Sequence, residues 1–337
     1  MKSGEIVGVL VGLLPVIAFL AALVSLDSYK LVKLPLVAGT VGVGALAAVA
    51  SYASNGAVLS HLAIDWSTFS RYVAPLIEEV LKGLIVLALI RTGRIAFLVD
   101  AAIFGFAAGT GFSVLENIYY SLSGIAQQAG IGTWIIRGFG TAIMHGGATA
   151  IFGVASLSFL ERAGVPKLLA PAPGLVLAYC LHSLYNQALL PPIYQTFLVL
   201  ALVPALLAFV FWRGEKSLAQ WLGTGFDNDA QLLELLNSGE FSGSPLGQYL
   251  TTLRAKFDGP VVADMLCYVR LHTELALRAK GVLMLRESGF APPSDESVTE
   301  KFAELRYLQG TLGATGRMAL RPVLHLSRKD LRQIYIL

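Results

Sequence analysis

The strongest constraint on this chain is a series of seven apolar segments, each long enough to cross a lipid bilayer. A helix needs about 20 mostly apolar residues to span the hydrocarbon core, and it satisfies its backbone hydrogen bonds internally. Only 14% of the 337 residues are charged, whereas soluble proteins carry about 25%. The sequence therefore predicts an all-α, polytopic membrane helix bundle with about seven transmembrane helices. The segments are residues 6–26, 34–53, 71–91, 95–121, 133–160, 168–189 and 193–212.

The charged residues divide the chain into two parts. Residues 1–213 contain 11 of the 25 Lys and Arg residues and 8 of the 22 Asp and Glu residues, so most of the charge follows this point. In the second part, residues 261–287 carry apolar side chains at helical spacing. We expect a transmembrane domain at 1–213 and a small helical domain at 214–337.

Basic residues fall in alternate connections between the predicted spans. The other connections, 54–70, 122–132 and 190–192, contain no Lys or Arg. The positive-inside rule then places the N-terminus outside and the C-terminal domain in the cytoplasm. Lys2, Arg71 and Arg137 lie on the opposite side, but singly, against four pairs. The pairs are Lys30 with Lys33, Arg91 with Arg94, Arg162 with Lys167, and Arg213 with Lys216.

The third apolar segment contains two adjacent glutamates and a lysine. A helix from Arg71 to Arg91 would be roughly 30 Å long, with Glu78 and Glu79 about 10 Å inside the bilayer. Burying a charge at that depth is costly, so an acid there indicates a functional site. A Glu78–Lys82 pair, four residues apart on one face, would account for one acid structurally. It leaves Glu79, about 100° round the helix, without a partner.

Three further spans carry ionisable side chains at a similar depth. Glu116, His145 and His182 fall in the outer half of the bilayer under the predicted topology, together with the glutamate pair. Either histidine alone could be a hydrogen-bonding group between helices. Five titratable side chains from four helices at one depth instead predict a single site.

Such a cluster suits hydrolysis. Two adjacent glutamates in a low dielectric cannot both ionise easily, and one could take a proton from water and return it to a leaving amine. Histidine and asparagine side chains can donate to a developing oxyanion. No His-Glu-x-x-His zinc motif and no Gly-x-Ser-Gly motif occurs. A divalent metal such as Zn²⁺ could also activate the water. Its ligands would come from Glu79, Glu116, His145 and His182.

Four ordered motifs in separate spans resemble those of the PrsW-type intramembrane proteases, in the wider group with the CAAX prenyl proteases and bacteriocin-processing enzymes. The resemblance covers residues from about 70 to 190. The prenyl-protease branch carries a histidine where this sequence has Glu116. The motifs are Glu78-Glu79-x-x-Lys82, Phe112-x-x-x-Glu116-x-x-x-Tyr120, His145 in MHGGATAIFG, and His182-Ser-Leu-Tyr-Asn186.

The resemblance implies that 1–213 is the domain of an intramembrane endopeptidase, either glutamate-type or a metalloprotease. Carried over residue by residue, it assigns catalytic roles to Glu78, Glu79, Glu116, His145, His182 and Asn186. The first two would activate water, the next two would complete the site, and the last two would stabilise the oxyanion. Its partners would be the lipid bilayer and membrane-anchored regulatory proteins such as anti-sigma factors, with no nucleic acid. We expect a multi-pass protein of a bacterial or archaeal plasma membrane.

Two other classes of function stay open from the residues alone. An ion- or proton-coupled transporter also needs intramembrane acids and histidines. It would favour inverted repeats with Gly- or Pro-broken spans at matching positions, which this sequence does not display. A non-catalytic membrane scaffold or sensor would suit the C-terminal domain, but it would leave the buried cluster without a task.

Overall fold

The computed structural model confirms the all-α prediction. It describes residues 3–123, 130–162, 165–238, 240–291, 297–320 and 322–324, and within these ranges it contains helices and no strands. The chain forms two compact units. One comprises residues up to Asp27 together with Leu31–Glu215, and the other comprises Ser28–Lys30 with the residues from Lys216 onward.

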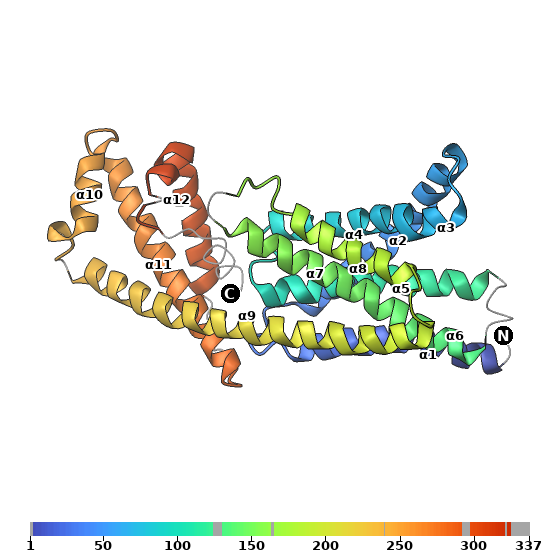
Figure 1. Cartoon of the computed structure of the whole chain (residues 1–337). Helices are drawn as coiled ribbons and strands as arrows, with labels where there is room; N and C mark the ends of the chain where they lie inside the picture. The colour runs from blue at the N-terminus through green and yellow to red at the C-terminus, as the bar shows by residue number, and fades with distance from the viewer. Residues whose placement is uncertain are drawn as a thin grey trace. The chain divides into compact units, whose positions relative to one another are not determined.

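Each of the seven predicted segments overlaps a helical stretch of the first unit, although several ends differ (Figure 1). Two of its elements, η1 and η3, are π-helical turns that run directly into the next helix. In chain order the elements are α1 (Ser3–Ser25), α2 (Leu34–His61), α3 (Trp66–Thr68), η1 (Phe69–Val73), α4 (Ala74–Arg91), α5 (Leu98–Leu122), α6 (Ile131–Ile135), η3 (Ile136–Thr141), α7 (Ala142–Leu160), α8 (Ala172–Asn186) and the first part of α9 (Pro192–Asn237).

Five helical segments of the described chain are long and apolar enough to cross a membrane: α1, α2, α5, the continuous segment Ile131–Leu160, and α9. The predicted count of seven is therefore not confirmed. The other two helices differ for physical reasons. Helix α4 contains Glu78, Glu79, Lys82 and Arg91, and α8 has only 15 residues.

Helix α5 forms the core of the first unit. Its residues from Val99 to Ser113 are all buried, and it packs against α1, α2, α4 and α7. The approach to α7 is close, since a Cβ on Gly109 would lie 2.3 Å from the carbonyl oxygen of His145. Only a glycine fits there, as is usual where membrane helices pack closely. The contact sets α7 at the depth where His145 faces α5.

The π-helical turn η1 and the proline that follows it leave two backbone carbonyls without an α-helical donor, and side chains of α8 donate to both. The Ala74 N–H donates to Phe69 O, five residues back, and so leaves Ser70 O without its α-helical donor. Pro75 has no N–H for Arg71 O. Asn186 Nδ2 donates to Ser70 O at 3.0 Å, and Ser183 Oγ donates to Arg71 O at 2.7 Å. These bonds fix α8 against the start of α4.

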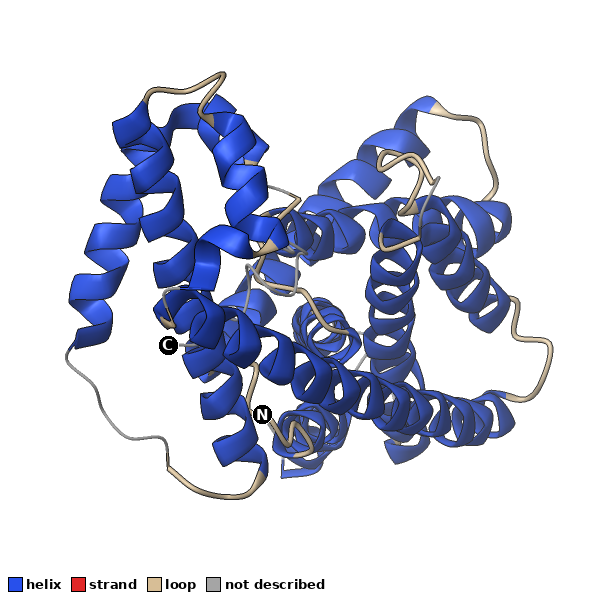
Figure 2. Ribbon diagram, turned by 90° about the vertical axis from the view of Figure 1, so that its left-hand side faces the viewer, coloured by secondary structure: helices blue, strands red, loops and turns tan. Residues whose placement is uncertain are grey.

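The second unit is helical as well (Figure 2). Its apolar core includes the predicted stripe on α11, which is buried along its length: Tyr268, Leu271, Leu275, Ala279 and Val282. Lys280 is buried on the same helix and is bonded to Asp229 Oδ2 at 2.6 Å and Gly225 O at 3.0 Å. The elements are the rest of α9, η4 (Glu240–Gly243), α10 (Pro245–Leu253), α11 (Gly259–Glu287) and α12 (Ser297–Ala319).

Candidate active site

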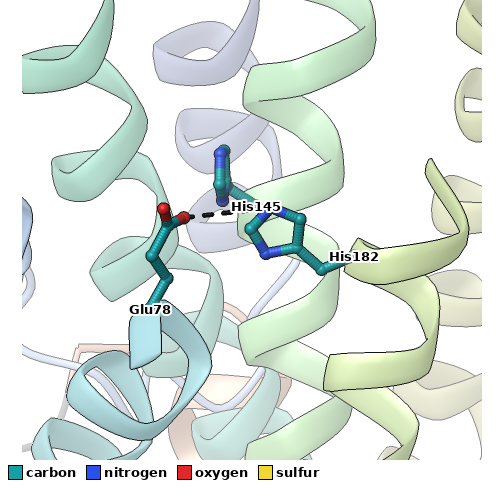
Figure 3. A group of neighbouring side chains, drawn as sticks. All are labelled: Glu78, His145 and His182. Carbon is teal, nitrogen blue, oxygen red and sulfur yellow. Dashed lines mark ion pairs between the residues drawn. The ribbon is translucent and has the colours of Figure 1, made fainter. Parts of the chain in front are cut away.

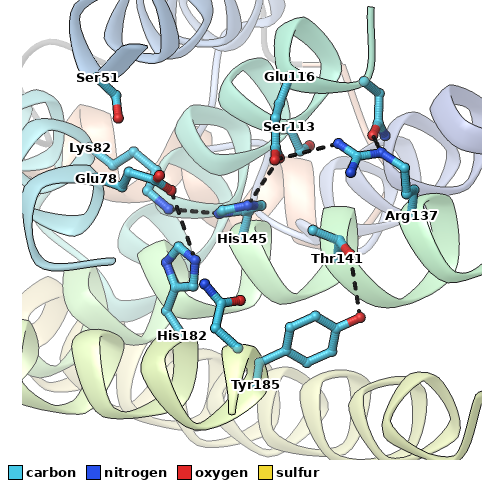
Figure 4. A network of polar contacts seen from close by, with 12 residues as sticks. Ser51, Glu78, Lys82, Ser113, Glu116, Arg137, Thr141, His145, His182 and Tyr185 are labelled. Carbon is cyan, nitrogen blue, oxygen red and sulfur yellow. Dashed lines mark hydrogen bonds and ion pairs between the residues drawn. The ribbon is translucent and has the colours of Figure 1, made fainter. Parts of the chain in front are cut away.

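Four helices of the first unit bring the predicted ionisable residues into one polar network. Figure 4 labels all of these residues except Glu79. The network has two arms, each a cation, a carboxylate and a histidine, and both arms end beside Glu78. Helix α4 supplies Glu78, Glu79 and Lys82, α5 supplies Glu116, α7 supplies His145, and α8 supplies His182.

The first arm joins Lys82, Glu79 and His182. Glu79 Oε1 accepts from Lys82 Nζ at 2.5 Å and from His182 Nδ1 at 2.8 Å. Both members of the ion pair are almost fully buried, at 0% and 1% exposure. The lysine thus pairs with Glu79 and not with Glu78, the alternative considered from spacing. Because a carboxylate oxygen only accepts, His182 Nδ1 donates in this bond, and its Nε2 faces Glu78 Oε2 at 3.8 Å.

The second arm joins Arg137, Glu116 and His145. Glu116 Oε1 lies 3.4 Å from the Arg137 guanidinium, and Glu116 Oε2 lies 3.2 Å from His145 Nε2. His145 Nδ1 then faces Lys82 Nζ at 3.0 Å. Arg137 lies in η3, and it had only been noted as a basic residue on the outer side.

Glu78 lies where the two arms meet. Among the described residues it forms no ion pair with Lys82 or Arg137. Glu78 Oε1 accepts a weak hydrogen bond from Asn55 Nδ2 of α2 at 3.4 Å. The side chains of Glu78, His145 and His182 each offer a metal-ligating atom, and these atoms all lie within 4.8 Å of one another (Figure 3).

Phe112 separates the arms from the core of the unit. Its ring centre lies 4.7 Å from Lys82 Nζ and 5.1 Å from the ring centre of His145. The rings of His145 and His182 meet edge to face, with centres 4.7 Å apart. This aromatic contact explains why the Phe112 motif position accompanies Glu116 one turn later. Lys82 and Phe112 are both buried, so the charge interactions of the lysine lie in a low-dielectric environment.

The donor chemistry of this group fits a divalent metal. Two histidines and one carboxylate form a ligand set typical of catalytic zinc. Each histidine also has an outer carboxylate on its far nitrogen, Glu79 for His182 and Glu116 for His145, as ligating histidines usually do. One feature opposes binding: both nitrogens of His145 have partners, so Lys82 or Glu116 must give one up.

This ligand set differs from the expected one in its carboxylates. Glu79 and Glu116 were expected among the ligands, but they lie behind the two histidines. Glu78, expected to act on water, is the carboxylate in the group. Asn186 lies one turn beyond His182, but its Nδ2 donates to Ser70 O, which leaves one N–H of the amide for another partner.

Three residues of the site were missed from the sequence: Asn55, Asn117 and Arg137. Asn55 lies beyond the predicted end of the second span, in a stretch expected to be a loop. Its Oδ1 is buried without a hydrogen-bond partner among the described residues. Asn117 directly follows Glu116, and its Oδ1 accepts from Arg137 Nε at 2.7 Å. Asn55 lies just beyond the end of a predicted span, and Asn117 directly follows Glu116. A search for polar residues at such positions would have found both of them.

The comparison with known proteins agrees with this geometry. A model of the PrsW family of intramembrane metalloproteases matches residues 33–212, a range that contains every residue of the two arms. No curated protein and no solved structure matches the chain. The resemblance inferred from the four motifs is thus confirmed. The chain belongs to the PrsW family of intramembrane metalloproteases and is an integral membrane protease.

Proposed function

We propose that this protein hydrolyses peptide bonds of membrane-anchored proteins and that Glu78 takes the proton from the attacking water. The observation that supports this role is the charge balance of the network. Glu79 is paired with Lys82 and Glu116 with Arg137, whereas Glu78 has no permanent cation beside it among the described residues. A carboxylate without a fixed counter-charge accepts a proton at the lowest cost.

The other residues prepare this step. Glu79 bonds His182 Nδ1 and so fixes the orientation of that ring, and Glu116 lies 3.2 Å from His145 Nε2 on the far side of the second ring. A divalent metal held by His145 and His182 beside Glu78 would supply a Lewis acid and a more acidic water. Glu78 accepts the proton from the water and then returns it to the leaving amine. Glu79, which the resemblance pairs with Glu78 as a water activator, orients His182 in this proposal.

The proposed substrates are single-span regulatory proteins of the anti-sigma-factor kind, as the family resemblance implies. A peptide bond reaches the site only where its helix is unwound, because an intact substrate helix hides its carbonyls. We place the cut at or just outside the extracytoplasmic end of the substrate span, since the site residues fall in the outer half under the positive-inside topology.

The decisive experiment compares Glu78→Gln with wild type on candidate single-span substrates in detergent. Gln keeps the shape of the side chain and removes the base, so we expect the rate to fall roughly 10²–10⁴-fold with unchanged accumulation. Near-wild-type cleavage by Glu78→Gln contradicts the proposed base. A parallel reaction with a chelator separates the metal-dependent from the glutamate-type reaction. Mass spectrometry of the products locates the bond, and a cut at the cytoplasmic end contradicts the proposed depth.

A further inference from the structure

Helix α1 lies outside the range that the family model matches, yet it contacts the second arm of the site. Asn117 connects the two: its Nδ2 donates to Gly12 O of α1 at 2.8 Å, and its Oδ1 accepts from Arg137 Nε at 2.7 Å. Both bonds are short for amide and guanidinium donors and involve buried or half-buried groups. The amide therefore holds the guanidinium at a fixed distance from the α1 backbone.

The fit between α1 and the segment that carries Arg137 depends on small residues. A Cβ on Gly12 would lie 2.7 Å from a ring carbon of Trp134, and a Cβ on Gly8 would lie 2.5 Å from the same indole. A Cβ on Gly138, next to Arg137, would lie 2.1 Å from Val11 O. Any larger residue here pushes α1 away from α6 and η3, so this interface sets how close the segment that carries Arg137 lies to α1.

Aromatic rings hold the guanidinium from the other direction. Its central carbon lies 4.2 Å from the ring centre of Tyr120, and Tyr120 meets Trp134 edge to face at 5.6 Å. Arg137 thus uses Nε for Asn117, one terminal nitrogen for Glu116, and its planar face for Tyr120. Lysine cannot make these three contacts at once, because it presents a single point charge.

We propose that Arg137, anchored to α1 through Asn117, is a positioning residue that holds Glu116 against His145. This inference rests on the proposed function only for the role of His145 at the reacting centre. Helix α1 then belongs to the support of the active site, although the family model does not include it. Without the bond to Asn117, the guanidinium is free to move away from Glu116. The carboxylate then no longer holds its position against His145 Nε2.

The first test needs neither metal nor activity. The full chain is purified in detergent as wild type, Gly12→Val, Glu116→Gln and the double variant, and the thermal midpoint is measured by size exclusion after heating. Gly12→Val should lower the midpoint by about 5 °C in wild type, and by about half of that when Glu116 is already neutral. Equal losses in the two backgrounds overturn the proposal, because α1 would then act only through packing.

The matched control is Gly42→Val on α2, whose Cβ meets nothing within 4 Å. It adds the same bulk to an exposed face and should leave the midpoint unchanged. If Gly12→Val does not accumulate, Asn117→Ala replaces it in the same cycle, since it removes both anchoring bonds without adding volume. The expected coupling with Glu116→Gln is the same, and its absence again overturns the proposal.

The second test uses Co²⁺ alone as the probe and reads its visible absorption spectrum during titration of the full chain. Arg137→Lys and Gly12→Val should weaken Co²⁺ binding about 10-fold or more, as loss of an outer partner of a ligating histidine does, whereas Gly42→Val should not. Wild-type affinity and spectrum in Arg137→Lys overturn the positioning role. Absence of Co²⁺ binding in the wild type contradicts the proposed metal site instead, and the thermal cycle still decides the role of Arg137.

Discussion

Glu78 and Glu79 are neighbours in the sequence, but they meet different parts of the bundle. About 100° of helix rotation separates them, so Glu79 faces Lys82 and α8, and Glu78 faces α2. Glu79 accepts hydrogen bonds from Lys82 and His182. Glu78 has only a long contact with the Asn55 amide, and His182 Nε2 at 3.8 Å. The Glu-Glu motif therefore contains one carboxylate paired with Lys82 and one that has no Lys or Arg partner among the described residues.

This division predicts opposite outcomes for two Gln variants. Glu79→Gln leaves Lys82 charged, buried and unpaired, which costs about 3–5 kcal/mol, so less protein should accumulate in the membrane. Adding Lys82→Met should restore accumulation but not activity. Immunoblots of membrane fractions measure the first effect, with Glu78→Gln as the matched control. A double variant that accumulates no better than Glu79→Gln alone contradicts the assignment of the ion pair.

Asp27 gives a pH dependence that arises outside the spans. It is buried directly after α1, where Asp27 Oδ2 accepts from the Val32 N–H at 3.0 Å. Burial, with Asp100 and Glu215 nearby, raises the pKa of Asp27 to about 6. The folded state therefore binds a proton more tightly than the unfolded chain, whose aspartate pKa is near 3.9.

The stability that Asp27 contributes is present below about pH 4 and is lost as the pH rises through about 6. Asp27→Asn keeps an acceptor for Val32 and cannot ionise. We expect its thermal midpoint in detergent to exceed that of wild type at pH 7.5 and to match it at pH 4.5. Parallel midpoint curves for the two proteins between these pH values contradict the raised pKa.

At the scale of the helices, the π-helical turns explain which side chains the sequence failed to place. Arg137 precedes His145 by eight residues, which puts them about 80° apart on an uninterrupted α-helix. The extra residue of the π-helical turn η3 brings them to within about 20° of each other. No hydropathy or spacing rule indicates a π-helical turn, so the arginine that completes the second arm was not found.

Asn186 tests whether the resemblance or the geometry describes α8 correctly. If its amide mainly holds Ser70 O, Asn186→Ala should lower the thermal midpoint and reduce cleavage less than 10-fold. Ser183→Ala is the matched control, because it removes the equivalent bond to Arg71 O. An oxyanion donor would cost roughly 10²–10³-fold in rate. A loss of that size in Asn186→Ala alone, at unchanged midpoint, supports the oxyanion role.

The helices themselves could largely be predicted, because hydropathy and helical period are local properties. Their ends were less accessible. Helix α2 continues to His61, eight residues beyond the predicted span, since Asn55 and its neighbours are compatible with a helix although not apolar. Helix α9 runs on to Asn237, because its sequence changes from apolar to amphipathic without a helix-breaking residue after Pro204. The hydropathy pattern therefore ends the predicted span at residue 212, whereas the helix itself continues.

For the whole molecule, the orientation in the membrane is still a prediction. The paired basic loops place the N-terminus outside and the residues after Lys216 in the cytoplasm. Reporter fusions before Ile6 and after Lys216 should therefore report opposite sides. Fusions at Leu62 and Thr92, on either side of α4, should also report opposite sides. Identical reports from the latter two show that α4, with its four charged residues, does not cross.

The members of the site could be predicted as a set, but their pairing could not. Charged residues inside apolar spans are rare, so composition alone identified Glu78, Glu79, Glu116, His145 and His182. Which carboxylate meets which histidine depends on helix rotation and on the approach of α7 to α5 at Gly109. These are properties of packing between distant segments. Asn117 shows this most directly, because its partner Gly12 lies 105 residues away.

That distance along the chain has a consequence for biosynthesis. Glu79 and His182 are separated by 103 residues, and Lys82 and His145 by 63. Helix α8 must therefore be synthesised before the contacts of the first arm can form. Helix α1 is likewise synthesised well before its partner η3. A nascent chain that has inserted α4 carries its glutamates without the histidines that complete the site. Under the proposed mechanism, cleavage would therefore begin only after α8 has joined the bundle.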